Sequence, residues 1–262
     1  MSESQNKPLI LITNDDGVEA KGIQSLIEAI RPLGTVVAVA PADAQSGMSH
    51  AITVKVPLRI TKIREEEDLT VYKCFGTPVD CVKMALNHLL PRKPDLLLSG
   101  INHGSNSAAS VFYSGTMGAA LEGCINDITS IGFSLLNLDH DADFSTATHF
   151  AQSITRNVLK NGLPQNICLN VNIPDITLNQ VAGIMLCRQN KGYWQEEFDQ
   201  RTDPAGKHYF WLTGVFHNAE PDATDTDEWA LNNNFVSIVP LQTDLTSHET
   251  LKALTNRNFH HE

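Results

Sequence analysis

An unbroken apolar run at residues 9–13 leads directly to two adjacent carboxylates, Asp15 and Asp16. A run of this length is typical of a strand that is buried on both faces of a parallel sheet. Apolar residues then recur at helical spacing over 23–30, and a second apolar run follows at 36–40. The start of the chain therefore predicts a β-α-β unit, whose right-handed crossover places two parallel strands side by side.

The alternation of strand and helix patterns continues along the chain. Thr77 and Pro78 mark a helix start, because Thr is a good N-cap and Pro is favoured in the first turn. Further strands are expected at 95–99, 131–136 and 167–172, and further helices at 116–124 and 146–160. This alternation predicts an α/β fold with a doubly wound, mostly parallel, Rossmann-like sheet. We expect residues 1–262 to form a single domain.

The last third of the chain has a different character. All three Trp and two of the four Tyr lie between Tyr193 and Trp229, in polar sequence that contains Gly and Pro. This distribution predicts an extended β-hairpin arm at about residues 190–235 rather than more sheet. An aromatic arm too small for its own core needs another surface, and a second subunit would provide one. The alternative is that these aromatic side chains pack on their own domain.

Net charge limits the partners that the chain can attract. Lys and Arg number 19 against 30 Asp and Glu, a formal net charge of −11. Such a charge repels polyanions, so nucleic acid is not expected as a partner. A small phosphate ester would fit only where a metal ion, helix N-termini or local basic groups offset the repulsion.

Cysteine usage and hydropathy indicate the compartment. The five cysteines lack C-x-x-C spacing, and we expect them to be reduced thiols in the core. Residues 1–7 are polar and too short for a signal h-region, and no apolar run approaches the length that spans a bilayer. We therefore expect a cytoplasmic protein without membrane contact.

The loop after the first predicted strand has the most unusual chemistry. Ligand sites in open parallel sheets lie beyond the carboxyl ends of the strands. In this loop Asp15 and Asp16 can turn toward one point, where their mutual repulsion requires a cation. The alternative is a turn in which one Asp caps the next helix, which explains one carboxylate and not the second.

The loops after the next two strands offer oxygen atoms and small residues. The first contains Ser46, Gly47 and Ser49, where a hydroxyl can ligate a hard cation and backbone amides can approach an anion. The second contains Asn102 and Asn106, whose amides provide oxygen ligands and hydrogen-bond donors. A Ser/Gly loop alone is more often only a turn.

A helix is expected to begin at Ser114, Gly115 and Thr116. Helix N-termini bind phosphate through free amides and the helix dipole, although N-capping alone explains Ser114 or Thr116 considered singly. Oxygen-only ligands at these strand ends favour Mg²⁺, Mn²⁺ or Ca²⁺. No G-x-G-x-x-G follows the first strand and no P-loop motif occurs, so dinucleotide and P-loop chemistry are not indicated.

Five motifs occur in order along the chain. They are Asn14-Asp15-Asp16-Gly17-Val18, Ala40-Pro41 followed by Ser46-Gly47-Met48-Ser49, Gly76-Thr77-Pro78 with Asp80-Cys81-Val82, Ser99-Gly100-Ile101-Asn102-His103-Gly104 with Asn106, and Tyr113-Ser114-Gly115-Thr116. Their order and spacing resemble the SurE survival protein family of 5'/3'-nucleotidases, and the resemblance covers nearly the whole chain. One departure is Lys21, where the family commonly has Pro.

The resemblance implies a site, a reaction and an assembly. One Mg²⁺ or Mn²⁺ per subunit would be held by Asp15, Asp16, Ser46 and Asn102, the residues that the strand-end argument also selects. The reaction would be hydrolysis of nucleoside 5'- and 3'-monophosphates, and sometimes of short polyphosphate. The assembly would be a homodimer or homotetramer whose C-terminal arms exchange.

We assign catalytic roles to Asp15, Asn102 and Ser114. Contacts with the substrate phosphate are expected from Gly47, Ser49, Asn106, Gly115 and Thr116. Attack by a metal-associated water and an aspartyl-phosphate route through Asp15 both remain open. The alternative function is a metal-dependent nucleotide-binding or regulatory protein without turnover.

Overall fold

The computed structural model describes residues 7–255 and residue 257. The strands of its main sheet are β1 (Leu9–Thr13), β2 (Thr35–Pro41), β3 (Ile60–Glu65), β4 (Leu69–Cys74), β5 (Leu96–His103), β6 (Ser130–Leu135), β7 (Ile167–Ile173), β8 (Gly183–Leu186) and β11 (Phe235–Gln242). A separate hairpin consists of β9 (Tyr193–Thr202) and β10 (His208–His217). The α-helices are α1 (Lys21–Ile30), α2 (Pro78–Met84), α3 (Gly115–Ile125), α4 (Ser145–Asn161), α5 (Asp227–Asn232) and α6 (His248–Thr255).

The strand order across the main sheet is β3-β4-β2-β1-β5-β6-β7-β11-β8. Six neighbouring strands, from β4 to β7 in that order, run parallel. Strand β3 is antiparallel to β4, and β11 is antiparallel to β7. The prediction of an α/β fold with a mostly parallel, doubly wound sheet is therefore confirmed.

The direction of winding changes between β1 and β5. After β1 the chain adds β2 on one side, and it later adds β5 on the other side of β1. Such a switch point opens a crevice at the carboxyl ends of the two strands, which is where open α/β sheets bind ligands. The loops that follow β1 and β5 therefore occupy the position where a site is expected.

Both faces of the sheet are buried, which explains the unbroken apolar runs in the sequence. Successive side chains of a strand point to opposite faces. Ile10 and Ile12 belong to the core that contains residues of α1 and α4, whereas Leu9 and Leu11 belong to the core that contains residues of α2 and α3. Helix α2 begins as predicted, with a capping box between Thr77 and Asp80.

One prediction about the sheet was wrong, and two strands were missed. Beyond about residue 180 we expected a hairpin arm and no more sheet, yet β8 and β11 extend the main sheet and Val236 and Ile238 lie in its core. Strands β3 and β4 lie between residues 41 and 77, where no element had been assigned from the sequence. Only part of the predicted arm forms the hairpin, because Trp229 lies in α5 and stacks on Phe235 at a centroid distance of 6.3 Å.

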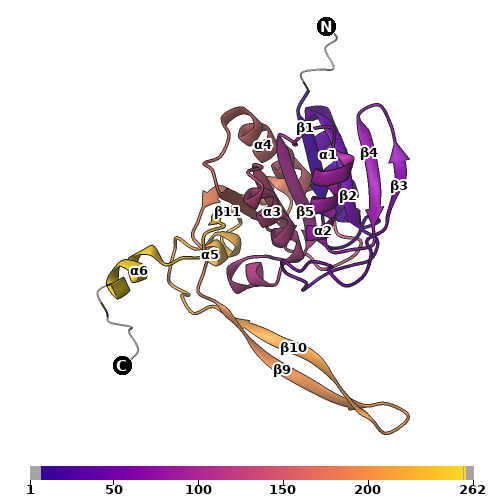
Figure 1. Cartoon of the computed structure of the whole chain (residues 1–262). Helices are drawn as coiled ribbons and strands as arrows, with labels where there is room; N and C mark the ends of the chain where they lie inside the picture. Colours follow the sequence, from indigo (N-terminus) through magenta and orange to yellow (C-terminus); the bar gives the residue numbers. More distant parts are fainter. Residues whose placement is uncertain (1–6, 256, 258–262) are drawn as a thin grey trace.

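The hairpin of β9 and β10 extends away from the sheet and its helices (Figure 1). Its ten cross-strand pairs run from Tyr193 and His217 at the root to Thr202 and His208 near the tip. Elsewhere, all five cysteines are buried and form no disulfide. In the described part of the chain, no helix combines the length and apolarity that crossing a membrane requires.

Candidate active site

The two carboxylates lie in a tight turn that follows β1. The side-chain amide of Asn14 donates a hydrogen bond of 2.9 Å to the carbonyl oxygen of Gly17, which closes the turn. Asp15 is only 3% exposed, and Asp16 is partly buried and accepts a 3.1 Å hydrogen bond from the backbone amide of His103. The turn thus joins the end of β1 to the end of β5.

The N-terminus of α3 packs directly against Asp15. Thr116 is fully buried, and its hydroxyl donates a hydrogen bond of 2.5 Å to Asp15 Oδ1. A Cβ atom on Gly115 would lie 2.8 Å from Asp15 Cβ and 2.9 Å from Oδ2, so glycine is needed for this approach. Ser114 caps α3, because its hydroxyl oxygen accepts a 3.0 Å hydrogen bond from the amide of Met117.

Burial raises the pKa of both carboxyl groups. For Asp15 the pKa rises to about 6, chiefly because the group is buried and further because of the charge of Asp16, while hydrogen bonds from Thr116 oppose the rise. The pKa of Asp16 is raised by burial and lowered in part by the amide of His103. Within the described residues neither carboxylate forms a salt bridge. Two buried carboxylates without a cationic side chain favour a bound cation.

The end of β5 is irregular next to Asn102. The register between β5 and β6 shifts between Ser99 and Asn102, and Gly100 has a φ of 128°. A Cβ atom on Gly100 would lie 2.3 Å from the carbonyl oxygen of Phe133. The Asn102 side-chain amide donates a 2.7 Å hydrogen bond to the carbonyl oxygen of Gly104, which leaves its Oδ1 as the available acceptor. Asn102 precedes His103, whose amide binds Asp16, and its own contact with a metal stays a prediction.

The loop after β2 is held against Asp15 by its backbone. The amide of Gln45 donates a 2.7 Å hydrogen bond to the carbonyl oxygen of Asp15, and a turn closed by Met48 follows. Ser46 and Gly47 form the exposed tip of this turn. Gln45 was not singled out from the sequence, because the group that binds is a backbone amide and has no residue signature.

Two predicted phosphate contacts have structural partners. The Ser49 hydroxyl donates a 2.7 Å hydrogen bond to the carbonyl oxygen of Phe112. The Asn106 side chain is buried and donates a 2.8 Å hydrogen bond to Ser134 Oγ, while its backbone amide donates to Asn172 Oδ1. Both residues therefore fix the loops around the site, and direct contact of either with phosphate stays a prediction.

The predicted donor set would suit a hard divalent cation. It consists of the carboxylates of Asp15 and Asp16, the amide oxygen of Asn102 and the hydroxyl of Ser46, which are the ligand types that Mg²⁺ and Mn²⁺ prefer. Ser46 is exposed in the turn after β2, and its role as a ligand stays a prediction. The residues that the structure describes contain no cluster of three or more His, Cys, Asp or Glu suited to a metal ion. Any metal in this crevice would thus be bound by two carboxylates and neutral oxygens.

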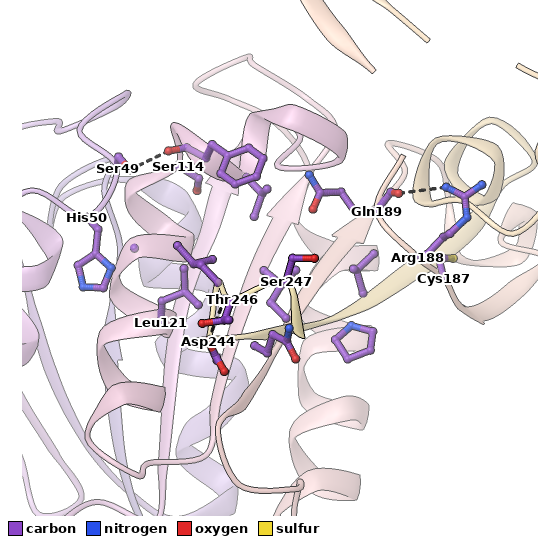
Figure 2. Close-up of a pocket in the computed structure, with 18 residues that line it drawn as sticks. Ser49, His50, Ser114, Leu121, Cys187, Arg188, Gln189, Asp244, Thr246 and Ser247 are labelled. Carbon is purple, nitrogen blue, oxygen red and sulfur yellow. Dashed lines mark hydrogen bonds between the residues drawn. The ribbon is translucent and has the colours of Figure 1, made fainter. Parts of the chain in front are cut away.

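Neither Asp15 nor Asp16 lines the cavity drawn in Figure 2. It has a volume of about 660 Å³ and is mainly apolar. Ser49 and Ser114 line one part of it, and Asp244, Thr246 and Ser247 from the segment after β11 line another (Figure 2). Because neither Asp15 nor Asp16 faces this cavity, we do not assign the chemistry to it.

A family described as "Survival protein SurE" matches residues 10–196 of the chain. The chain belongs to the SurE family. Proteins named 5'-nucleotidase SurE from two bacteria are similar over almost their whole length. The relative from Phocaeicola vulgatus is 51% identical over 255 residues, covering 97% of this chain and 98% of its own. The relative from Flavobacterium johnsoniae is 54% identical over 249 residues, covering 95% and 96%.

The crystal structure of the SurE protein from Aquifex aeolicus has the same fold. The two structures agree with a TM-score of 0.82 at 38% sequence identity, over 95% of this chain and 98% of the Aquifex chain. The resemblance drawn from the five sequence motifs is thus confirmed for family and fold.

Proposed function

We propose that this chain is a metal-dependent phosphomonoesterase that hydrolyses nucleoside 5'-monophosphates to nucleoside and phosphate. The observation that carries the proposal is the buried pair of Asp15 and Asp16 at the switch point of the sheet, against the N-terminus of α3. Relatives that are 51% and 54% identical are named 5'-nucleotidase SurE. We include nucleoside 3'-monophosphates and short polyphosphate as further substrates of the same site.

In this proposal Asp15, Asp16, Asn102 and Ser46 hold one Mg²⁺ or Mn²⁺. When bound, the metal polarises the phosphate and supplies an activated water at neutral pH. The raised pKa of Asp15 supports this assignment, because a nearby cation would offset the burial and the charge of Asp16 that raise it. Thr116 holds Asp15 in place through its hydroxyl, so a loss of that hydrogen bond would loosen the ligand set.

The substrate phosphate would lie at the start of α3. Free amides of a first helical turn and the helix dipole stabilise negative charge that develops on phosphate oxygens. Gly115 allows this helix start to reach Asp15, and Ser114 fixes the first turn by capping it. Asn102 would orient the phosphate from the opposite strand end. In this scheme Asp15, which follows β1, and Ser114, which caps α3, act on the same phosphate.

The aspartyl-phosphate route through Asp15 can be separated from direct attack by water. Hydrolysis of an aspartyl phosphate at phosphorus puts the solvent oxygen into phosphate, as direct attack by water does, so the intermediate itself has to be trapped. A single turnover is quenched in acid and treated with borohydride, which reduces a phosphorylated carboxyl group to an alcohol. We expect an unmodified Asp15 carboxylate. A reduced side chain in the peptide that contains Asp15 would replace our scheme with the covalent route.

The proposal is tested by phosphate release from a panel of substrates. The panel contains 5'- and 3'-nucleoside monophosphates and short polyphosphate, each with Mg²⁺, with Mn²⁺ or with a chelator. We expect metal-dependent release that is fastest with 5'-monophosphates. Absence of release from every substrate, together with metal-dependent binding of nucleotide, would favour the binding or regulatory protein instead.

We further propose that the hairpins join subunits into a homodimer or homotetramer with exchanged arms. Large side chains on both strands of the hairpin are exposed in a single chain, among them Phe198, Phe210 and Trp211. A large exposed apolar surface usually marks a site of contact with another protein. The mass of the assembly in solution tests whether the hairpins join subunits.

A further inference from the structure

A second cavity, of about 470 Å³, is lined in part by the residues that follow Asn102 in the chain. His103 and Ser105 line it from the loop that follows β5. The root of the hairpin and the helix α5 provide other walls. Its volume lies in the range of sites that hold small molecules. His103, which lines it, also donates its backbone amide to Asp16 in the carboxylate crevice. A ligand bound at Asp15 and Asn102 could therefore extend into it.

One wall of this cavity is aromatic. Trp194 and Phe216 pair at the root of the hairpin, with ring centroids 5.7 Å apart and planes inclined by 64°. The indole nitrogen of Trp194 donates a 3.2 Å hydrogen bond to Ser110 Oγ, which fixes the orientation of the ring. The Trp194 side chain is still 44% exposed, so part of the ring is free for contact. Aromatic faces of this kind stack on any nucleobase.

Another wall is polar and is built by α5. Glu228 and Asn232 are four residues apart, so they share one face of this helix, and both line the cavity. One oxygen of Glu228, Oε1, accepts a hydrogen bond from the Ser107 hydroxyl, and no donor in the described part of the chain reaches Oε2. The start of α5 is anchored, because Asp227 accepts 2.9 Å hydrogen bonds from the amides of Ala108 and Asn190.

We propose that this cavity binds the nucleobase of the substrate, with the ring against Trp194 and Phe216 and an exocyclic amino group donating to Glu228 Oε2. The inference rests on the proposed function, since it takes the phosphate to be bound at Asp15 and Asn102. One ribose separates phosphate and base in a nucleoside monophosphate, and His103 links the two places, because it lines the cavity while its backbone amide donates to Asp16 Oδ2. Two other cavities fit less well: one of about 660 Å³ lacks this aromatic pair, and one of about 400 Å³, which Trp194 lines together with Gly47 and Tyr113, offers no carboxylate.

The site makes a prediction about base preference. A carboxylate oxygen accepts from the amino groups of adenine and cytosine and repels the carbonyl oxygens of hypoxanthine and uracil at the same position. Adenosine monophosphate should therefore have a kcat/KM roughly tenfold above that of inosine monophosphate, and cytidine monophosphate should exceed uridine monophosphate in the same sense.

The experiment compares the wild-type protein with Glu228→Gln, Trp194→Ala and the control Trp211→Ala at the hairpin tip. Glu228→Gln should reduce the adenosine-to-inosine ratio to about one, because the glutamine amide can donate as well as accept. Trp194→Ala should raise KM for every nucleotide by roughly tenfold. For each variant the effect on nucleotides is divided by the effect on ribose 5-phosphate, which has no aromatic ring to lie against Trp194, and Trp211→Ala should leave this ratio unchanged. Circular dichroism checks that each variant is folded.

Binding of adenosine without phosphate or metal, measured by calorimetry, provides a readout that is independent of turnover. We expect weak binding in the wild type that Trp194→Ala removes and Trp211→Ala retains. Equal effects of Trp194→Ala on ribose 5-phosphate and on nucleotides, or an unchanged base ratio in Glu228→Gln, would overturn the base site while leaving the phosphatase intact. No hydrolysis of any ester by the wild type would instead contradict the proposed function, and adenosine binding would then decide the base site alone.

Discussion

The strand-end crevice that contains Asp15 and the hairpin of β9 and β10 differ in how far a single chain buries their side chains. In the crevice Asp15 is 3% exposed and is held by hydrogen bonds from the Thr116 hydroxyl and the Gln45 amide. In the hairpin Trp211 is 60% exposed and Phe198 is 66% exposed. The crevice needs only a small cation to offset its charge, whereas the hairpin needs a large apolar surface. We therefore expect the chemistry to depend on the single chain and the assembly to depend on the hairpin.

The largest expected effect concerns the crevice. Asp15→Asn removes one of two clustered carboxylates and should lower metal-dependent phosphate release by about 10²–10³-fold or more, because a charged ligand is lost. The steady-state rate at saturating Mg²⁺ measures this. Asp222→Asn, at an exposed position, is the control and should keep the wild-type rate. A wild-type rate in Asp15→Asn would show that Asp15 is not part of the active site.

The second prediction concerns the hairpin. Replacement of residues 198–212 by a two-residue turn removes the exposed aromatic tip and retains Trp194 and Phe216 at the root. Light scattering should then give a mass at least about twofold lower than that of the wild-type assembly. Val56→Ser, which removes an exposed apolar side chain elsewhere, should leave the mass unchanged. The same mass with and without the tip would mean that these aromatics do not join subunits.

The third prediction tests whether Thr116 supports metal binding by holding Asp15 in place. Thr116→Val keeps the shape of the side chain and removes the hydroxyl that donates to Asp15 Oδ1 at 2.5 Å. A hydrogen bond to a charged group contributes roughly 1.5–3 kcal/mol, so Mn²⁺ affinity should fall about tenfold or more. Thr116→Ser retains the hydroxyl and should bind Mn²⁺ nearly as the wild type does. Equal affinities of the Val and Ser variants would show that this hydrogen bond does not support the metal site.

The smallest effect is on stability in the absence of metal. Burial raises the pKa of Asp15 from an ordinary 3.8 to about 6, so the folded state binds this proton more tightly than the unfolded state. The free energy of unfolding should therefore fall as pH rises from about 4 to about 6, by about 3 kcal/mol from this group. Asp15→Asn should flatten that part of the curve, as measured by urea denaturation with chelator present. An equally steep decrease in the variant would assign the effect to other groups.

Residues near the start of the chain were predicted well because local pattern and packing agree there. The run at β1 is apolar throughout because both of its faces are covered, and the two carboxylates follow where the strand leaves the core. Predictions for the second half of the chain were less accurate. Trp229 resembles the hairpin aromatics in composition but lies on α5 against Phe235, so a deletion from 193 to 229 would also remove part of the body.

Contacts between distant elements could not be predicted from local patterns. The Thr116 hydroxyl binds Asp15, 101 positions away in the chain, and Glu228 meets Ser107 across 121 positions. Helix capping explained Ser114 from the sequence, and the structure confirms that cap. It gave no indication that Gly115 lets the helix approach a carboxylate, because that role depends on where Asp15 lies.

The most direct test of the metal-dependent site is a titration of metal-free protein with Mn²⁺. Bound metal is counted by electron paramagnetic resonance, and phosphate release from adenosine 5'-monophosphate is measured in the same samples. Our account predicts that the rate rises in proportion to bound Mn²⁺ and saturates at one ion per chain, with no corresponding binding in Asp15→Asn. A full rate in protein that holds no metal would contradict it.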